Sequence, residues 1–328
     1  MLVSLPHTKE YTFETPMDQT PFVPKKNLQE TFEKIAALQE NALIKRIKHI
    51  GVKSIIVGVS GGLDSTLALL IAVRAYDMLG LSRKDIIGVT MPGLHTSSET
   101  KKHALELMKH LGITIKEIDI NKHIKEHFQL IDHDGVTQDI TYENTQARIR
   151  TTVLMNLANK EQGIVLGTGD LSELVLGWCT YNGDQMSMYG INSGIPKTLV
   201  RFMIKEYALF KFNEEIRPVL EGIVATPITP ELTENQTTEE TIGKYEVNDF
   251  MIHRMFRFGD DEARIVWLLE KTFDLTRKES ERYAHNFFTR FYSQQFKRQA
   301  LPDGPKILDI GISPRGDLRL PSDIDYSF

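Results

Sequence analysis

Four short apolar runs that alternate with helical stretches constrain the fold of this chain more than any other feature of its sequence. The runs are Ser54 to Val59, Ile86 to Met91, Ile113 to Ile118 and Gly163 to Leu166. The helical stretches lie near Thr66 to Leu79, Ser97 to Leu111 and Thr141 to Asn159. Strands that alternate with helices at this spacing are typical of an α/β fold with a doubly wound parallel sheet. Such sheets bind ligands at the carboxyl ends of their strands, so we expect the functional residues there.

The segments outside this alternation complete the predicted domain, which spans residues 28–328 and has a helical C-terminal part. Apolar residues recur at helical spacing in three further stretches: Leu28 to Ile50, Asp249 to Trp267, and Arg277 to Phe296. Residues 1–27 show no sustained period, which predicts an extended leader or a linker remnant. Residues 222–247 carry prolines and many threonines, which predicts a long lid-like loop. A disordered surface excursion is the alternative interpretation of that loop.

Charge and cysteine content exclude several classes of protein. The net charge of −5 argues against the broad basic surface that nucleic-acid binding usually needs. The single cysteine, Cys179, excludes an internal disulfide and fits a reducing compartment. We expect it to be a packed residue beside Trp178 rather than a nucleophile. No apolar run approaches the ~18 residues of a membrane span, and the start of the chain lacks the features of a signal peptide. We therefore expect a cytoplasmic protein that binds neither nucleic acid nor membrane.

The strongest chemical signal is the run VSGGLDS, in which Ser60, Gly61 and Gly62 follow the first buried strand and Asp64 and Ser65 begin a helix. The glycines permit positive φ and close approach of a phosphate, and the amides and dipole of the helix start favour an anion. The two serines add hydroxyl donors. A carboxylate beside a phosphate is repulsive unless a cation lies between them, and Mg²⁺ is the obvious bridge. The alternative is a glycine turn with a helix cap, which would suit any α/β protein.

Two common nucleotide-binding patterns are absent. The loop lacks the G-x-x-x-x-G-K-[ST] pattern, and Gly167-Thr168-Gly169 does not continue as G-x-G-x-x-G. Thr168 follows the fourth strand directly, where a hydroxyl can meet a nucleotide, although a helix cap is the alternative. Glu173 lies about one helical turn farther along and can face the same Mg²⁺ as Asp64. Taken alone, Glu173 would be assigned to the surface.

The glycine loop resembles the pyrophosphate-binding loop of the ATP pyrophosphatase superfamily, whose members split ATP into AMP and pyrophosphate. Further motifs are similar to those of NAD synthetases of the glutamine-dependent branch. They are YENTQARIR (Tyr142 to Arg150), LGTGDLSELVLGW (Leu166 to Trp178), GIPKTL (Gly194 to Leu199), QFKR (Gln295 to Arg298) and SPRGD (Ser313 to Asp317). The resemblance covers roughly residues 28 to 323, and it implies the adenine nucleotide alpha hydrolase-like variety of the doubly wound sheet.

The resemblance also implies a set of site residues. ATP would contact Gly58, Ser60, Gly61, Gly62, Asp64, Ser65, Thr168 and Lys197, and Mg²⁺ would bind Asp64 and Glu173. The dinucleotide substrate would contact Asn144, Arg148, Glu173, Trp178 and Lys297, with the helix from Asn144 to Arg150 near a homodimer interface. Thr226 would close over ATP. From residue chemistry alone, Trp178 could stack on a nicotinate or adenine ring or belong to the core. Arg148, Lys197 and Lys297 suit phosphates, and each would otherwise be taken as solvated.

The implied reaction is ATP-dependent amidation of nicotinic acid adenine dinucleotide to NAD through an acyl-adenylate, with Asp64 and Lys197 as catalytic residues. Members of the glutamine-dependent branch carry an amino-terminal glutaminase domain, for which these 328 residues leave no room. We therefore expect the chain to use ammonia. A stand-alone synthetase, an excised domain and a glutaminase on a separate chain all stay open. The alternatives are a ligase of the same superfamily that acts on tRNA or GMP, and a silent nucleotide-binding module. The acidic charge disfavours tRNA, and the presence of Asp64, Glu173 and Lys197 disfavours the module.

Overall fold

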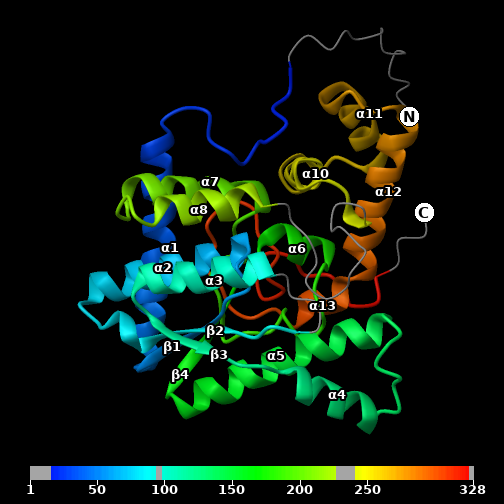
Figure 1. Cartoon of the computed structure of the whole chain (residues 1–328). Coiled ribbons are helices and arrows are strands. Elements are labelled where there is room, and N and C mark those ends of the chain that lie inside the picture. The colour runs from blue at the N-terminus through cyan, green and yellow to red at the C-terminus, as the bar shows by residue number, and fades with distance from the viewer. Residues whose placement is uncertain (1–15, 94–97, 227–240, 325–328) are drawn as a thin grey trace, which may run out of the picture.

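The computed structural model describes residues 16–93, 98–226 and 241–324, and it contains one five-stranded sheet in that part of the chain (Figure 1). The strand order is β3-β2-β1-β4-β5, and every neighbouring pair is parallel. The strands are β1 (Ser54–Gly58), β2 (Ile86–Thr90), β3 (Thr114–Glu117), β4 (Gly163–Gly167) and β5 (Tyr189–Gly190). The predicted doubly wound parallel sheet is therefore confirmed.

Strand β1 lies at the centre of the sheet and determines where a ligand can enter. It pairs with β2 on one side (Ile55 opposite Ile86) and with β4 on the other (Ile55 opposite Ile164). The chain leaves β1 toward one edge of the sheet and leaves β4 toward the other edge. In such sheets the ligand-binding crevice lies at the carboxyl ends of the two strands that flank the reversal, and we call the region at the ends of β1 and β4 the crevice.

Helices cover both faces of the sheet. On one face α2 (Leu63–Leu79) and α3 (Ser98–Leu111) contact the strands. An outer layer packs on these two helices and consists of α1 (Leu28–Ile50), α7 (Lys197–Phe210) and α8 (Arg217–Ala225). On the other face lie α5 (Ile140–Lys160) and α4 (Asn121–Leu130), which packs against α5 (Figure 1). A single turn of 3-10 helix, Arg83–Asp85, precedes β2.

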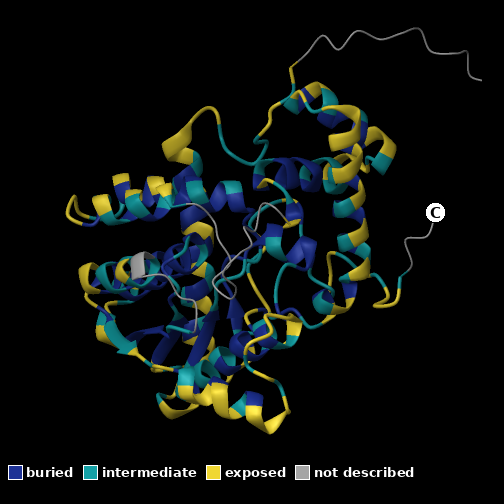
Figure 2. Cartoon of the chain, turned by 45° about the vertical axis from the view of Figure 1, so that its right-hand side comes forward, coloured by how far each residue is buried: buried dark blue, intermediate teal, exposed yellow. Residues whose placement is uncertain are grey.

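Helix α2 is the centre of the core, and its sequence reflects its surroundings. Twelve of its residues are buried, from Leu63 to Tyr76, because the sheet lies on one side and α1 and α7 lie on the other. A helix that is enclosed in this way is apolar on all sides rather than amphipathic. Figure 2 shows the resulting pattern, in which the strands and central helices are buried and the exposed residues lie on outer helices and turns. The loop between β1 and α2 is therefore fixed at both of its ends.

A second hydrophobic cluster holds the helical C-terminal part beside the sheet. It joins α6 (Leu171–Leu176) to α10 (Tyr245–Phe258), α11 (Glu262–Phe273) and α12 (Arg277–Ser293). The short α13 (Gln295–Gln299) follows α12, and the chain then returns over this cluster through Ile310 and Ile312. Helix α6 contacts α7 in the layer over the sheet and α10 and α12 in the C-terminal part, so it connects these two parts of the molecule.

Several predicted boundaries were wrong. The single helix expected from Asp249 to Trp267 is two helices, because Gly259 adopts a left-handed conformation (φ 70°) that ends α10, and Asp261 caps α11. The helix expected to reach Phe296 ends at Ser293. Helix α2 begins at Leu63, ahead of the stretch expected near Thr66, and the strand bounds differ from the expected ones by one residue at one or both ends.

The predicted loop 222–247 was wrong at both of its ends. Gly222 to Ala225 belong to α8, and Tyr245 to Val247 belong to α10. Residues 227–240 lie outside the described residues, so the lid itself stays a prediction. At the other end of the chain, the described part of the predicted leader, residues 16–27, contains no helix or strand. Met17 and Phe22 of this segment pack against the second cluster.

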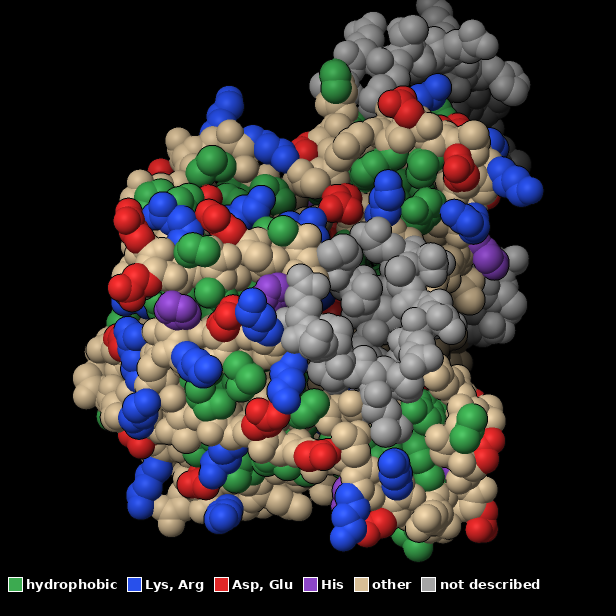
Figure 3. Space-filling view, viewed as in Figure 1, with side chains coloured by type: hydrophobic (Ala, Val, Ile, Leu, Met, Phe, Trp, Pro, Cys, Tyr) green, Lys and Arg blue, Asp and Glu red, His purple; other side chains and the backbone are tan. Residues whose placement is uncertain are grey.

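No helix in the described ranges is both long enough and apolar enough to cross a membrane. On the face shown in Figure 3, the side chains of Lys and Arg are interspersed with those of Asp and Glu.

Candidate active site

The glycine loop lies at the carboxyl end of β1, as the sequence predicts. Gly61 has a φ of +94°, and a Cβ there would collide with the backbone carbonyl oxygen of Thr100 in α3. Only glycine fits a position that combines this φ with such close packing. Gly62 is the N-cap of α2 and supplies no side-chain acceptor to the first turn. The N–H groups of this first turn can therefore serve an anion.

The two predicted serines of this loop contact each other. The Oγ atoms of Ser60 and Ser65 are 3.2 Å apart, and the Gly62 N–H donates to Ser60 Oγ at 3.1 Å. Ser65 Oγ also lies 3.2 Å from the carbonyl oxygen of Gly62. These contacts hold both hydroxyl groups on one side of the turn.

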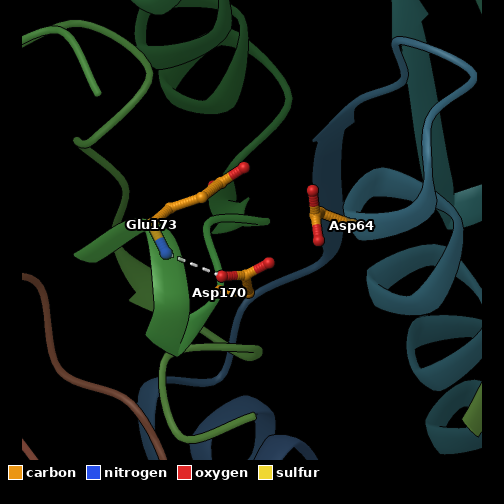
Figure 4. Close-up of side chains that lie close together, drawn as sticks. All are labelled: Asp64, Asp170 and Glu173. Atoms are coloured by element: carbon orange, nitrogen blue, oxygen red, sulfur yellow. Dashed lines mark hydrogen bonds between the residues drawn. The ribbon is translucent and has the colours of Figure 1, made fainter. Parts of the chain in front are cut away.

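Three carboxylates meet in the crevice between β1 and β4 (Figure 4). Asp64 comes from the first turn of α2, and Asp170 and Glu173 come from the N-cap and the first turn of α6. Asp170 Oδ1 accepts the Glu173 N–H at 2.9 Å, which is a helix cap. The three side chains offer ligand oxygens that all lie within 4.8 Å of one another. The sequence predicted Asp64 and Glu173 as partners in a site, and it missed Asp170.

Lys197 places its ammonium group among these carboxylates. Its Nζ lies 2.5 Å from Asp64 Oδ2, 2.7 Å from Asp170 Oδ2 and 2.8 Å from Glu173 Oε1. The Lys197 side chain is only 4% exposed, and its Nζ lies 5.0 Å from the centroid of the Tyr245 ring. The residue begins α7, so this one group links α2, α6 and α7.

The cluster carries more negative than positive charge, and its pKa values reflect this imbalance. Burial raises the pKa of Glu173 to about 7, although Lys197 partly opposes the shift. Burial likewise raises the pKa of Asp170. Burial alone would lower the pKa of Lys197, but the neighbouring Asp170, Asp64 and Glu173 outweigh it and hold this pKa well above its usual value. A largely desolvated site with three carboxylates and one ammonium favours the entry of a further cation.

A fourth carboxylate, that of Asp249, is fully buried and supports the residues that carry this cluster. Pro196, the N-cap of α7, makes no side-chain cap, so the first N–H groups of that helix need other acceptors. Asp249 of α10 accepts the Thr198 N–H at 2.8 Å and the Thr198 hydroxyl at 2.6 Å. Ser172 Oγ accepts the Lys197 N–H at 2.9 Å and donates to Asp249. The start of α7 at Lys197, and Ser172 beside Glu173, are thus held by one buried network.

The predicted residues Arg148, Trp178 and Lys297 gather around a second feature, the segment 177–185 that follows α6. Arg148 Nε donates to the Tyr181 carbonyl oxygen at 3.2 Å, and Lys297 Nζ donates to the carbonyls of Gly177 and Cys179 at 2.9 and 2.7 Å. Arg290 lies 5.0 Å from the ring centroid of Trp178.

The segment 177–185 begins next to Glu173, because the Trp178 N–H donates to the Glu173 carbonyl oxygen at 2.8 Å. Lys297 is thus bound to backbone carbonyls and is not a solvated cation.

The remaining predicted residues lie at the edge of these groups. Asn144 is half-buried on α5, one turn from Arg148. Thr168 follows β4, and its carbonyl oxygen is hydrogen-bonded within the crevice. Thr226 is the C-cap residue of α8, and its hydroxyl donates to Gly222 at 2.9 Å. Burial raises the pKa of the Cys179 thiol, which makes this group a poor nucleophile.

The sequence of this chain matches a known protein family. The model of the NAD synthase family matches residues 35–300. A glutamine-dependent NAD(+) synthetase from Mycobacterium leprae is 41% identical over 342 residues, which cover 94% of this chain and 50% of that protein. An NH(3)-dependent NAD(+) synthetase from Pyrobaculum aerophilum is 31% identical over 226 residues, which cover 69% of this chain and 79% of that protein. The chain therefore spans about half the length of the Mycobacterium relative and most of the length of the Pyrobaculum one.

The fold has a counterpart among solved structures. A glutamine-dependent NAD(+) synthetase from Cytophaga hutchinsonii superimposes with a TM-score of 0.71 and 16% sequence identity. The match covers 89% of this chain and 54% of that chain. At this identity the likeness concerns the fold alone.

Proposed function

The chain belongs to the NAD synthase family, and we propose that it converts nicotinic acid adenine dinucleotide to NAD with ATP and ammonia, releasing AMP and pyrophosphate. The observation that carries this proposal is the cluster of Asp64, Asp170, Glu173 and Lys197, of which Asp170 and Lys197 are buried and the other two half-buried, beside a glycine loop at the point where the strand order reverses. A site of this kind suits a polyphosphate with its counter-ion. Sequence similarity to synthetases that use glutamine and to one that uses ammonia supports the reaction class.

The glycine loop would hold the β and γ phosphates of ATP. The first-turn N–H groups of α2 and the hydroxyls of Ser60 and Ser65 supply donors, and Gly61 and Gly62 leave no side chain in the way. Gly58 and Thr168 lie at the ends of the two central strands, on either side of the crevice. Thr226 would approach ATP from the end of α8. No protein nucleophile is required, because positioning and charge neutralisation supply the catalysis.

The residues present fit a divalent cation. Asp64 and Glu173 would hold Mg²⁺, and Asp170 lies within reach as a third ligand or as their support. Asp64 Oδ1 is buried and has no hydrogen-bond partner among the described residues, which leaves one ligand oxygen free. When bound, Mg²⁺ neutralises phosphate charge and orients the leaving pyrophosphate. Lys197 supplies a second, fixed positive charge at the same place.

The chemistry would proceed in two displacements. A carboxylate oxygen of the nicotinate attacks the α-phosphorus of ATP, the bond from this phosphorus to the bridging oxygen breaks, and pyrophosphate leaves into the glycine loop. Ammonia then attacks the carbonyl carbon of the acyl-adenylate, the bond to the AMP oxygen breaks, and a proton leaves the nitrogen. Asn144, Arg148, Glu173, Trp178 and Lys297 would contact the dinucleotide. We also propose that the chain forms a homodimer and that α5 lies near its interface.

The chemistry of the cysteine favours ammonia as the nitrogen donor. The hydrolysis of glutamine by a cysteine enzyme needs a reactive thiolate. The single cysteine of these 328 residues is half-buried, and this burial raises the pKa of its thiol. A glutaminase on another polypeptide could supply the ammonia.

The test is a product analysis with each nitrogen donor in turn. The pure chain is incubated with ATP, MgCl₂, nicotinic acid adenine dinucleotide and either ammonium or glutamine, and nucleotides are separated by chromatography. We expect NAD and AMP in equal amounts with ammonium and almost none with glutamine. ADP as the product would exclude the reaction, and rapid NAD formation with glutamine would exclude the assigned donor. Lys205→Met, an exposed change in α7, should behave as the wild type.

A further inference from the structure

Asn192 forms hydrogen bonds with the main chains of two segments, the phosphate-binding loop with the start of α2 and the residues that follow β4. It lies between β5 and α7 and is fully buried. Its side-chain amide Nδ2 donates to the carbonyl oxygen of Asp64 at 2.9 Å and to that of Thr168 at 3.0 Å. A carboxamide nitrogen has two hydrogens in one plane, and here each hydrogen is donated to a segment that follows a different strand, β1 or β4. One side chain therefore spans the reversal point of the sheet.

The backbone around Asn192 is itself anchored. The Ile191 N–H donates to Gly167 at the end of β4, and the Ile195 N–H donates to Asn192. The Ile195 carbonyl oxygen accepts the Leu171 N–H at 2.9 Å, at the start of α6. Gln39 of α1 is also fully buried and donates to the Ile191 carbonyl oxygen at 3.2 Å. The main-chain bonds of Ile191 and Ile195 fix the backbone on both sides of Asn192 without Gln39, whose bond adds to the stability of the segment and touches neither loop.

We propose that Asn192 is a positioning residue that sets the distance between the phosphate-binding loop and the Thr168–Glu173 loop, and so the alignment of ATP with its second substrate. The role in alignment rests on the function proposed above. The physical reason lies in the peptide plane, in which a carbonyl and the following N–H point in opposite directions. Because Asn192 holds the carbonyls of Asp64 and Thr168, it also fixes the directions of the amides of Ser65 and Gly169.

Lys197 connects the same two loops in a different way. Its flexible side chain contacts carboxylates, which also serve as the candidate cation ligands. A cation or a phosphate can compete for those contacts when substrates bind. The contacts of Asn192 involve carbonyl oxygens of the main chain and do not depend on the charge state of the cluster, so they can persist through the reaction.

The test compares Asn192→Leu with Gln39→Leu. Both changes replace a buried amide by an apolar group of similar size, and both act on the segment 191–195, but only Asn192 touches the loops. The readouts are kcat and KM for ATP, the midpoint of thermal unfolding, and amide hydrogen exchange in residues 60–66 and 167–171. We expect N192L to lower kcat/KM on the order of 10²-fold, as a misplacement of about 1 Å would. We also expect faster exchange in both segments.

Q39L should lower the unfolding midpoint while its kcat/KM and the exchange of both segments stay close to those of the wild type. A merely structural role for Asn192 would make the two variants alike in every readout, and that result would overturn the proposal. If N192L does not fold, Asn192→Ser, which is smaller and keeps one donor, takes its place in the comparison. If the wild type makes no NAD, the proposed function fails. Even then, unchanged exchange in both segments of the variant would overturn the positioning role, and faster exchange would support it.

Discussion

Replacement of Lys197 by methionine should expose the electrostatic imbalance of the carboxylate cluster. Methionine keeps most of the volume of the side chain and removes its charge. The ammonium lies 2.5 to 2.8 Å from three carboxylate oxygens and is 4% exposed. Removal of one partner from a buried ionic cluster costs about 3–5 kcal/mol, because the remaining charges stay uncompensated. We therefore expect the free energy of unfolding of K197M to fall by about that amount at pH 8.

Two features separate this effect from ordinary loss of packing. The first is pH. The pKa of Glu173 is already raised to about 7 by burial, and loss of the ammonium raises it further. A carboxyl group whose pKa is raised on folding favours the folded state at low pH and loses this contribution as pH rises through the folded pKa. The deficit of K197M should therefore shrink between pH 8 and pH 5.5.

The second feature is rescue by a cation. Mg²⁺ can replace the missing charge, and at 100 times its dissociation constant it would return about 2.7 kcal/mol. The assay is urea-induced unfolding at pH 8 and 5.5, with and without MgCl₂, for the wild type, K197M and the exposed control K205M. If K197M unfolds like K205M at pH 8, or if Mg²⁺ stabilises it no more than the wild type, the account of the cluster is wrong.

Three further predictions follow from the same structure. Gly61→Ala should destabilise the protein by roughly 1–3 kcal/mol or more, because φ is +94° and the new Cβ would meet the backbone of Thr100. Chemical denaturation measures this loss. Gly51→Ala, at φ +68° in open space, is the control that separates the contribution of backbone strain from that of the collision. Burial raises the pKa of Asp249 to about 6. The free energy of unfolding of the wild type should therefore fall relative to that of Asp249→Asn as pH rises from about 4 to 6, by at most about 1.4 kcal/mol per pH unit. Parallel pH profiles of the two unfolding free energies would contradict this. The dinucleotide should quench the fluorescence of Trp178 in a Trp267→Phe background, since these are the two tryptophans of the chain; unquenched emission at saturating substrate would remove Trp178 from the binding site.

The sequence predicted the parts of the fold that local patterns encode. Strands β1, β2 and β4 are short, mainly apolar runs, and the glycine loop joins a strand to a helix, so these features could be recognised without the structure. Strand β3 is mixed, with Lys116 and Glu117 beside Ile115, and it was recognised from the apolar residues at both ends of its run. Strand β5 has only two residues, and α4 buries only Ile124 and Phe128 in its ten residues. Signals this short or this amphipathic are difficult to separate from loops. The break at Gly259 was missed because apolar residues continue on both sides of it.

The site was predictable where its residues lie at strand ends and unpredictable where they come from elsewhere. Asp64 and Glu173 follow neighbouring strands, and the structure brings them together as expected. Asp170 had a usable signal, because an Asp three residues before a Glu at a helix start is a common cap pattern. Asn192 and Asp249 had none, since they reach the crevice from a connecting segment and from a distant helix. Their roles depend on tertiary packing, which residue spacing does not encode.

The most direct test of the central claim is the exchange of labelled pyrophosphate into ATP. If the crevice transfers the adenylyl group to the nicotinate carboxylate, exchange should require both Mg²⁺ and nicotinic acid adenine dinucleotide. It should proceed without any nitrogen donor and should disappear in Asp64→Asn. Exchange that is independent of the dinucleotide, or its persistence in Asp64→Asn, would contradict the account.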